Sequence, residues 1–201
     1  YGNTAVGRNS LYTNNGNNNT AVGHEALELN TSGSNNTSLG RQSLEANTTG
    51  NFNTSVGAFS LDSNTTGSSN TAVGEGSLGN ATTASNNTAV GSNALVANTT
   101  GSENTAVGYA ALDANTTGSN NIGMGYAALG SNTTGFRNVA IGSNNGALAS
   151  NTTGNDNVAV GADALYANTT ASNNTAVGHS ALGANTTGAN NTAVGHNSLD
   201  A

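Results

Sequence analysis

One short phrase recurs along the whole chain. The run Asn-Thr-Ala-Val-Gly, as at residues 19–23, or a close variant of it occurs twelve times in 201 residues. Its last residue is always glycine, at Gly7, Gly23, Gly40, Gly57, Gly74, Gly91, Gly108, Gly125, Gly142, Gly161, Gly178 and Gly195. Nine of the eleven spacings are 17 residues, and the others are 16 and 19. A fixed period of this length predicts a solenoid, in which each repeat packs only on its neighbours.

The repeat predicts one all-β domain over residues 1–201. We expect a β-solenoid of the β-roll type, with about 12 coils of 17 residues and two short strands in each coil. Because the chain starts and stops inside a repeat, we expect it to be a fragment of a longer fibre.

The phrase itself reads as the first strand of each coil. Alternation puts Thr105 and Val107 on one face and Ala106 on the other. The Val107 position becomes Met124 and Ile141 in other coils, which favours a buried face. A leucine four residues after the glycine would point back at this face from the second strand. The predicted core is therefore Val6, Val22, Leu27, Leu44, Val56, Leu61, Val73, Leu78, Val90, Leu95, Val107, Leu112, Met124, Leu129, Ile141, Val160, Leu165, Val177, Leu182 and Val194.

Two corners complete each coil. The residue after the phrase glycine varies widely between coils and is predicted to be exposed. The second corner is Asn-Thr-Thr-Gly, whose side chains can bond nearby backbone groups. Ala84 and Ala171 replace its glycine in two coils, so we expect an ordinary φ there. The coil after Gly142 carries two extra residues around Asn145 and Gly146, which predicts a bulge in the first corner.

Composition limits the function classes. Asn, Thr and Gly make up nearly half of the chain, lysine and cysteine are absent, and the net charge is −7. An acidic chain without lysine lacks the positive surface that nucleic acid requires. No stretch approaches the roughly 20 apolar residues of a membrane span. Neither a phosphate-binding loop nor a nucleophile elbow is found, so we expect no enzyme and no cofactor.

The phrase resembles a known family of surface fibres. Residues 138–142 and 157–161 resemble the Asn-x-Val-Ala-Ile-Gly phrase in the heads of YadA-like trimeric autotransporter adhesins. The full repeat at residues 104–121 is similar to tail-fibre-type repeats of phage and bacterial surface fibres. The resemblance covers the whole chain and implies a left-handed, typically trimeric β-roll on a cell or virion surface. The 17-residue period is longer than the YadA-type coil, and the Asn-Thr-Thr-Gly corner is expected to hold the difference.

The second corner repeats a glycosylation signal. Asn-x-Thr/Ser sequons there are candidate glycan sites in a line along the rod. The alternative is that these side chains only shape the corner and form ladders between coils. The candidates are Asn30, Asn47, Asn64, Asn98, Asn115, Asn132, Asn151, Asn168 and Asn185, with a shifted sequon at Asn80.

Other candidate sites are weaker. His179 and His196 should stack one coil apart, but no third ligand recurs for a metal. Tyr109 and Tyr126 should form a short exposed aromatic stack that could contact carbohydrate or a partner. Acidic residues share one column, which is too sparse in oxygen ligands for a row of calcium ions. That column contains Glu28, Glu45, Asp62, Asp113 and Asp200.

The sequence therefore predicts a structural protein. We expect a non-catalytic segment of an extracellular fibre or adhesin, with copies of itself as partners in a homotrimer or an end-to-end filament. A host or surface glycan is a further expected partner. The alternative is an ice- or carbohydrate-binding solenoid, disfavoured because the adjacent corner threonines point opposite ways.

Overall fold

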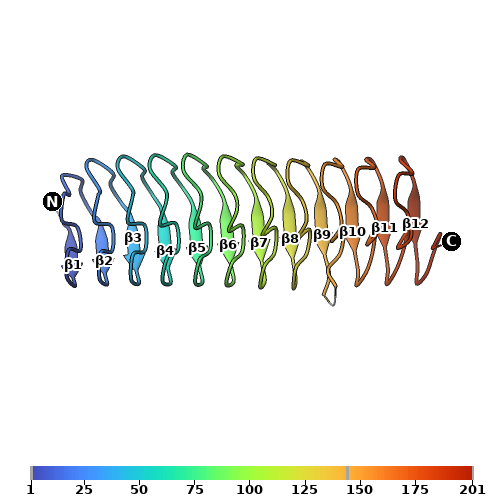
Figure 1. Cartoon of the computed structure of the whole chain (residues 1–201), viewed down its shortest axis with the longest axis horizontal. Coiled ribbons are helices and arrows are strands. Elements are labelled where there is room, and N and C mark those ends of the chain that lie inside the picture. Colours follow the sequence, from blue (N-terminus) through green and yellow to red (C-terminus); the bar gives the residue numbers. More distant parts are fainter. Residues whose placement is uncertain (1, 144, 201) are drawn as a thin grey trace.

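The computed structural model describes residues 2–143 and 145–200, and these form a β-solenoid. All strands belong to one parallel sheet in which each strand pairs with the next along the chain. Figure 1 shows the coils stacked side by side as a rod, with the sheet running along its length. No helix occurs among these residues. The predicted fold class is confirmed, at about 17 residues per turn.

Every strand is three residues long and lies in the repeated phrase. The strands are β1 (Thr4–Val6), β2 (Thr20–Val22), β3 (Thr37–Leu39), β4 (Thr54–Val56), β5 (Thr71–Val73), β6 (Thr88–Val90), β7 (Thr105–Val107), β8 (Ile122–Met124), β9 (Val139–Ile141), β10 (Val158–Val160), β11 (Thr175–Val177) and β12 (Thr192–Val194). The register sets like against like, so that Thr88 pairs with Thr105 and Val90 with Val107.

The expected second strand is absent from the described coils. The segment that carries the leucine is a run of turns, and Leu112 itself has φ = 55°. The same left-handed conformation recurs at the equivalent leucines, for example Leu27 and Leu165. A left-handed residue turns the chain sharply, which lets a 17-residue coil close with a single strand. The backbone still pairs between coils here, since Leu112 N donates to Ala128 O at 3.1 Å.

The core prediction is right for the leucines and wrong for the strand residues. The predicted leucines are buried: Leu27, Leu44, Leu61, Leu78, Leu95, Leu112, Leu129, Leu165 and Leu182. The predicted strand positions are half-buried or exposed: Val6, Val22, Val56, Val73, Val90, Val107, Met124, Ile141, Val160, Val177 and Val194. The residue at the centre of each strand faces inward instead, and Ala106 is fully buried.

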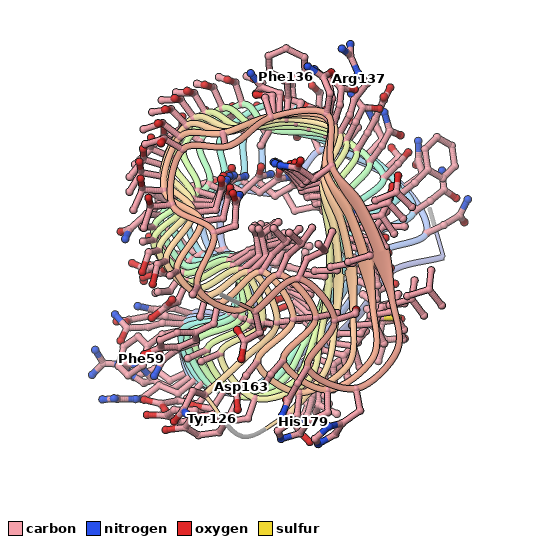
Figure 2. All side chains as sticks on the ribbon, turned by 90° about the vertical axis from the view of Figure 1, so that its right-hand side faces the viewer. Phe59, Tyr126, Phe136, Arg137, Asp163 and His179 are labelled. Atoms are coloured by element: carbon pink, nitrogen blue, oxygen red, sulfur yellow. The ribbon has the colours of Figure 1, made fainter. Side chains whose placement is uncertain are left out.

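Space explains why the small residue lies inside. A side-chain carbon added to Gly123 would lie 2.9 Å from Ala128 O and 3.2 Å from Leu112 Cγ. Only alanine, serine or glycine occupies this position in any coil, as at Ala106 and Ser55. In the end-on view the strands form one side of the coil, and stacked side chains point into its interior (Figure 2). The interior is therefore too narrow for valine opposite leucine.

In most coils the phrase glycine is required by both conformation and space. Gly108 has φ = 134°, and an added Cβ would lie 2.4 Å from Gly125 O in the next coil. No larger residue fits such a position without moving the backbone. The second-corner glycine differs, because neither Ala84 nor Ala171 has a positive φ. The expectation of an ordinary φ in that corner is confirmed.

The 19-residue coil recovers its register after the two extra residues. Gly146 has φ = 89°, as expected for a bulge near the Asn-Gly dipeptide. Leu129 N then donates to Ala147 O at 3.1 Å, and Leu148 N donates to Ala164 O at 2.9 Å. The insertion therefore changes one corner and leaves the stacking of the leucines intact.

Candidate functional surfaces

The asparagines of the second corner form a ladder inside the solenoid. Asn115 Nδ2 donates to Asn98 Oδ1 at 2.9 Å and to Gly118 O at 3.0 Å. Its own Oδ1 accepts from Asn132 Nδ2 in the following coil at 2.8 Å. A buried amide with its donor and acceptor both bonded contributes to stability, because no polar group is left without a partner.

A second ladder follows the asparagine that precedes each strand. The backbone N–H of Asn104 donates to Asn87 Oδ1 in the coil before it at 2.9 Å. Asn104 Nδ2 donates to Gly118 O at 2.9 Å, which ties this ladder to the second corner. Two polar columns therefore run beside the leucines and alanines in the interior.

Burial of the first ladder argues against glycosylation of the folded chain at most of the predicted sites. Glycans attach to Nδ2, and in the folded chain that atom lies inside the coil. The sequon asparagines with no exposed surface are Asn30, Asn47, Asn64, Asn98, Asn115, Asn132, Asn151 and Asn168. Asn185 is half-buried but donates Nδ2 to Asn168 Oδ1 and Gly188 O. These side chains hold coils together, which was the alternative interpretation.

One coil interrupts the ladder. Ala81 occupies the asparagine position, and Asn64 Oδ1 in the coil before it has no hydrogen-bond partner among the described residues. The shifted sequon of the same coil puts Asn80 outside, where its side chain is exposed. The sequence change therefore creates both a defect in the ladder and an accessible sequon.

The sequence interpretation missed a second set of sequons. They read Asn-Asn-Thr, and their threonine is the first strand residue. Their first asparagine is exposed in every case, at Asn18, Asn35, Asn86, Asn173 and Asn190. Each has φ between 55° and 62°, the left-handed conformation that asparagine tolerates. The Asn-x-Thr spacing alone would have identified these sequons in the sequence.

The two kinds of threonine column have different hydrogen bonding. In the second corner, Thr116 Oγ1 donates to Thr133 O of the next coil at 3.0 Å. Equivalent bonds join Thr48 to Thr65 and Thr99 to Thr116. Among residues 2–143 and 145–200, no hydrogen bond involves the hydroxyl groups of the strand threonines, such as Thr105. The strand hydroxyls are therefore free to bind water.

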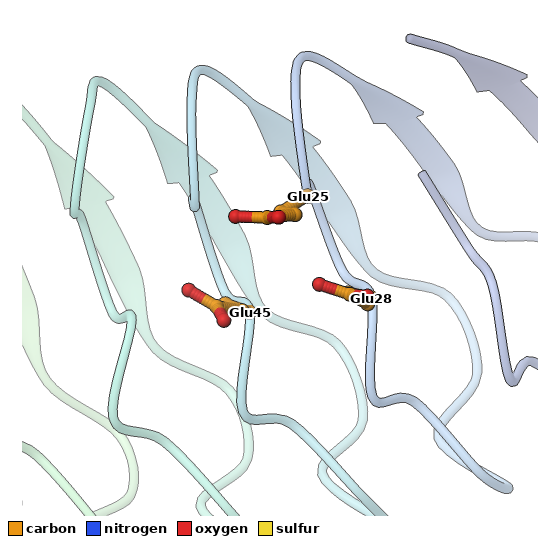
Figure 3. A group of neighbouring side chains, drawn as sticks. All are labelled: Glu25, Glu28 and Glu45. Atoms are coloured by element: carbon orange, nitrogen blue, oxygen red, sulfur yellow. The ribbon is translucent and has the colours of Figure 1, made fainter. Parts of the chain in front are cut away.

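Glu28 and Glu45 of the predicted acidic column lie near the start of the rod, together with Glu25, which was not predicted. One carboxylate oxygen from each of Glu25, Glu28 and Glu45 lies within 4.8 Å of the others (Figure 3). Arg8 lies 3.7 Å from Glu25 and His24 lies 3.2 Å from it. Three oxygen ligands fall short of the six to eight that Ca²⁺ takes, so the cluster is not a calcium site as it stands.

Burial makes several of these carboxyl groups harder to ionise. Desolvation, followed by the charge of Glu25, raises the pKa of Glu45 above 4.5. Desolvation also raises the pKa of Asp62 and of Asp113 above 3.8, against hydrogen bonds that lower it. Their negative charge therefore opposes folding at neutral pH.

Both predicted ring stacks form on the outer surface. Tyr109 and Tyr126 have ring centroids 5.5 Å apart, and His179 and His196 have centroids 5.1 Å apart. Arg137 pairs with Asp156 through Nε and Oδ1 at 2.6 Å. This pairing raises the pKa of Arg137 and lowers that of Asp156. All of these contacts join neighbouring coils, so they support the stacking.

No family model matches the chain, and neither the curated proteins nor the solved structures contain a match. Within the described residues, no helix has the length and apolar character needed to cross a membrane.

Proposed function

We propose that this chain is a non-catalytic structural segment of an extracellular fibre or adhesin, carried on a cell surface or a virion. The observation that carries the proposal is the unbroken pairing of coil with coil along all twelve strands. The coils of this repetitive rod are hydrogen-bonded to one another around the whole circumference. Such a rod is suited to carrying load and to displaying a long surface.

Three sets of bonds support rigidity. The parallel sheet joins the strands, and turn amides pair between coils, as where Ala114 N donates to Gly130 O at 3.1 Å. The buried asparagine ladders join neighbouring coils in the interior, as where Asn115 Nδ2 donates to Asn98 Oδ1. Bending the rod would stretch all three sets at once, so a coil cannot tilt independently of its neighbours.

The proposed location is tested on the source cells or particles. An antibody raised against the folded chain should label thin surface fibres on intact, unpermeabilised material in immunogold electron microscopy. The control is the same antibody after permeabilisation. Label that appears only after permeabilisation would overturn the surface location.

The proposed partners are further copies of the chain. A homotrimer should have about three times the 19.5 kDa mass of one chain in light scattering after size exclusion. A series of larger masses would support end-to-end filaments instead. A single mass of 19.5 kDa at high protein concentration would reject both assemblies. A surface glycan as partner is tested on a glycan array, where binding to no glycan would reject it.

A further inference from the structure

The outer face of the sheet between β2 and β7 carries two straight columns of side chains. We call it the Thr-x-Val strip, and it consists of Thr20, Val22, Thr37, Leu39, Thr54, Val56, Thr71, Val73, Thr88, Val90, Thr105 and Val107. Every member is half-buried or exposed, and none carries a charge. Leu39 is the single departure from the Thr-x-Val pattern in these six coils.

The strip has a regular spacing in two directions. Parallel register places Thr71 beside Thr88 and Val73 beside Val90. Neighbouring strands lie about 4.8 Å apart, and side chains two residues apart on one strand lie roughly 7 Å apart. Threonine and valine are β-branched and therefore stiff at χ1, so their methyl groups hold these spacings with little loss of entropy on binding.

The hydroxyl groups of the strip make no hydrogen bond to the described part of the protein. Among the described residues none of them takes part in a hydrogen bond, whereas the first threonine of most second corners, such as Thr82, donates to a carbonyl of the next coil. The strip therefore presents rows of free hydroxyls beside rows of methyl groups. The hydroxyls can bind water, and the methyls line the strip with apolar surface that accepts no hydrogen bond from it.

The dimensions of the strip disfavour a protein partner. At these spacings each side chain covers about 33 Å², so the twelve side chains of the strip cover roughly 400 Å². A stable protein interface needs about 800 Å² on each partner and is usually anchored by Trp, Tyr or Arg. The strip contains none of these three residue types. A lattice needs only matching periodicity, which the strip has.

We propose that the Thr-x-Val strip binds ice. Oxygen rows of hexagonal ice repeat at close to the spacing between neighbouring strands, so water bound to the strip can merge with the crystal surface. The neighbouring strands β8–β10 lack strand threonines and carry Met124, which interrupts the pattern. The proposal concerns a binding activity of the strip and does not depend on the fibre function.

The test is partition of the fluorescently labelled chain into a growing ice hemisphere, together with thermal hysteresis. The native chain should enter the ice and lower the freezing point below the melting point. Thr71→Tyr, at the middle of the strip, should lose most of both effects, because the ring breaks the two rows. Thr83→Tyr is the matched control, since Thr83 is exposed in the same coil but lies in the second corner. It should behave as the native chain.

A milder substitution separates the contribution of the hydroxyl groups to ice binding from that of the methyl groups. Thr71→Val keeps the methyl packing and removes one hydroxyl, so partial loss of hysteresis is expected. Exclusion of the native chain from ice, or equal effects of Thr71→Tyr and Thr83→Tyr, would overturn the proposal. Light scattering that shows a side-by-side oligomer, with the strip protected from labelling, would also overturn it. Circular dichroism of each variant verifies that the fold is retained.

Discussion

Single asparagines inside the coil have a larger role than their polarity suggests. Asn115 and its equivalents use both ends of the amide, and each links the coil before it to the coil after it. Removing one amide leaves a neighbour unpaired in a buried site, which costs about 1–3 kcal/mol. The chain already contains this change at Ala81, beside the unpaired Asn64 Oδ1.

Ala81→Asn should repair the ladder. The new amide can donate to Asn64 Oδ1 and accept from Asn98 Nδ2, and Asn168 shows that asparagine is compatible with an alanine corner, because it donates to Ala171 O at 3.1 Å. We expect the free energy of unfolding to rise by about 1 kcal/mol. Urea denaturation measures it, with Thr83→Asn on the exposed side as control. A lower unfolding midpoint for Ala81→Asn would contradict the ladder.

Glu45 gives the protein a pH dependence of predictable sign. Desolvation and the nearby charge of Glu25 raise its pKa in the folded state above 4.5. A group with a raised folded pKa contributes stability below its unfolded pKa, and that contribution is lost as the pH rises through the folded pKa. Glu45→Gln should therefore be more stable than the native chain at pH 7.

The advantage of Glu45→Gln should shrink as the pH falls below 4.5, where the native carboxyl is protonated in both states. Thermal unfolding from pH 3 to pH 8 measures the difference. The control is Glu103→Gln, at an exposed glutamate of another coil. An advantage that is unchanged at low pH would contradict the burial argument.

At the scale of the element, a three-residue strand has two faces, and its alternation does not say which face is inside. The β-branched residues at Thr105 and Val107 suit an exposed sheet face as well as a buried one, which is why the sequence interpretation chose wrongly. The restriction of the central position to Ala, Ser and Gly was the better signal, because a crowded interior accepts only small side chains. The inward position of the leucine, in contrast, could be predicted from its period alone.

Several other features of the coil could be predicted from the sequence, but the conformation of its leucine could not. The period predicted the parallel register, the stacked rings and the ladder interpretation of the corner, since each depends only on which residues are one coil apart. The left-handed leucine was not predictable from propensity, because leucine seldom has a positive φ. Closure of the coil by its neighbours imposes that conformation at Leu112, where φ is 55°.

The two faces should respond differently to truncation. Leu112→Ala removes a fully buried side chain and should lower the free energy of unfolding by about 2–5 kcal/mol. Val107→Ala, in the same coil but on the outer face, should change it by only about 0.5 kcal/mol. Equal losses in guanidinium denaturation would mean that the strand valine is also in the core.

At the scale of the whole molecule, the rod is a one-dimensional stack. Each strand contacts only the strand before it and the strand after it. In such proteins the free energy of unfolding is close to a sum of one contribution from each coil and one from each interface between neighbouring coils. The intact stacking around the 19-residue coil shows that one irregular corner does not disturb the neighbouring coils.

Removal of one whole coil should therefore be tolerated. Deletion of residues 88–104 joins Asn87 to Thr105 and recreates the native Asn-Thr junction. We expect a folded chain with the same circular dichroism per residue and a lower unfolding midpoint, because one interface is lost. Deletion of residues 88–96, about half a coil, should unfold the chain. Similar behaviour of the two deletions would contradict the stacked architecture.

The inside and outside of the coil can be measured directly along the rod, because the chain has no cysteine of its own. Single cysteines at Ser55, Ala106 and Ala176 should react slowly with a water-soluble maleimide, and single cysteines at Val56, Val107 and Val177 should react fast. The same contrast in β4, β7 and β11 would confirm one interior of leucine, alanine and asparagine along the whole molecule. The reverse contrast would contradict it, and equal protection of both sets would mean that the outer face is covered.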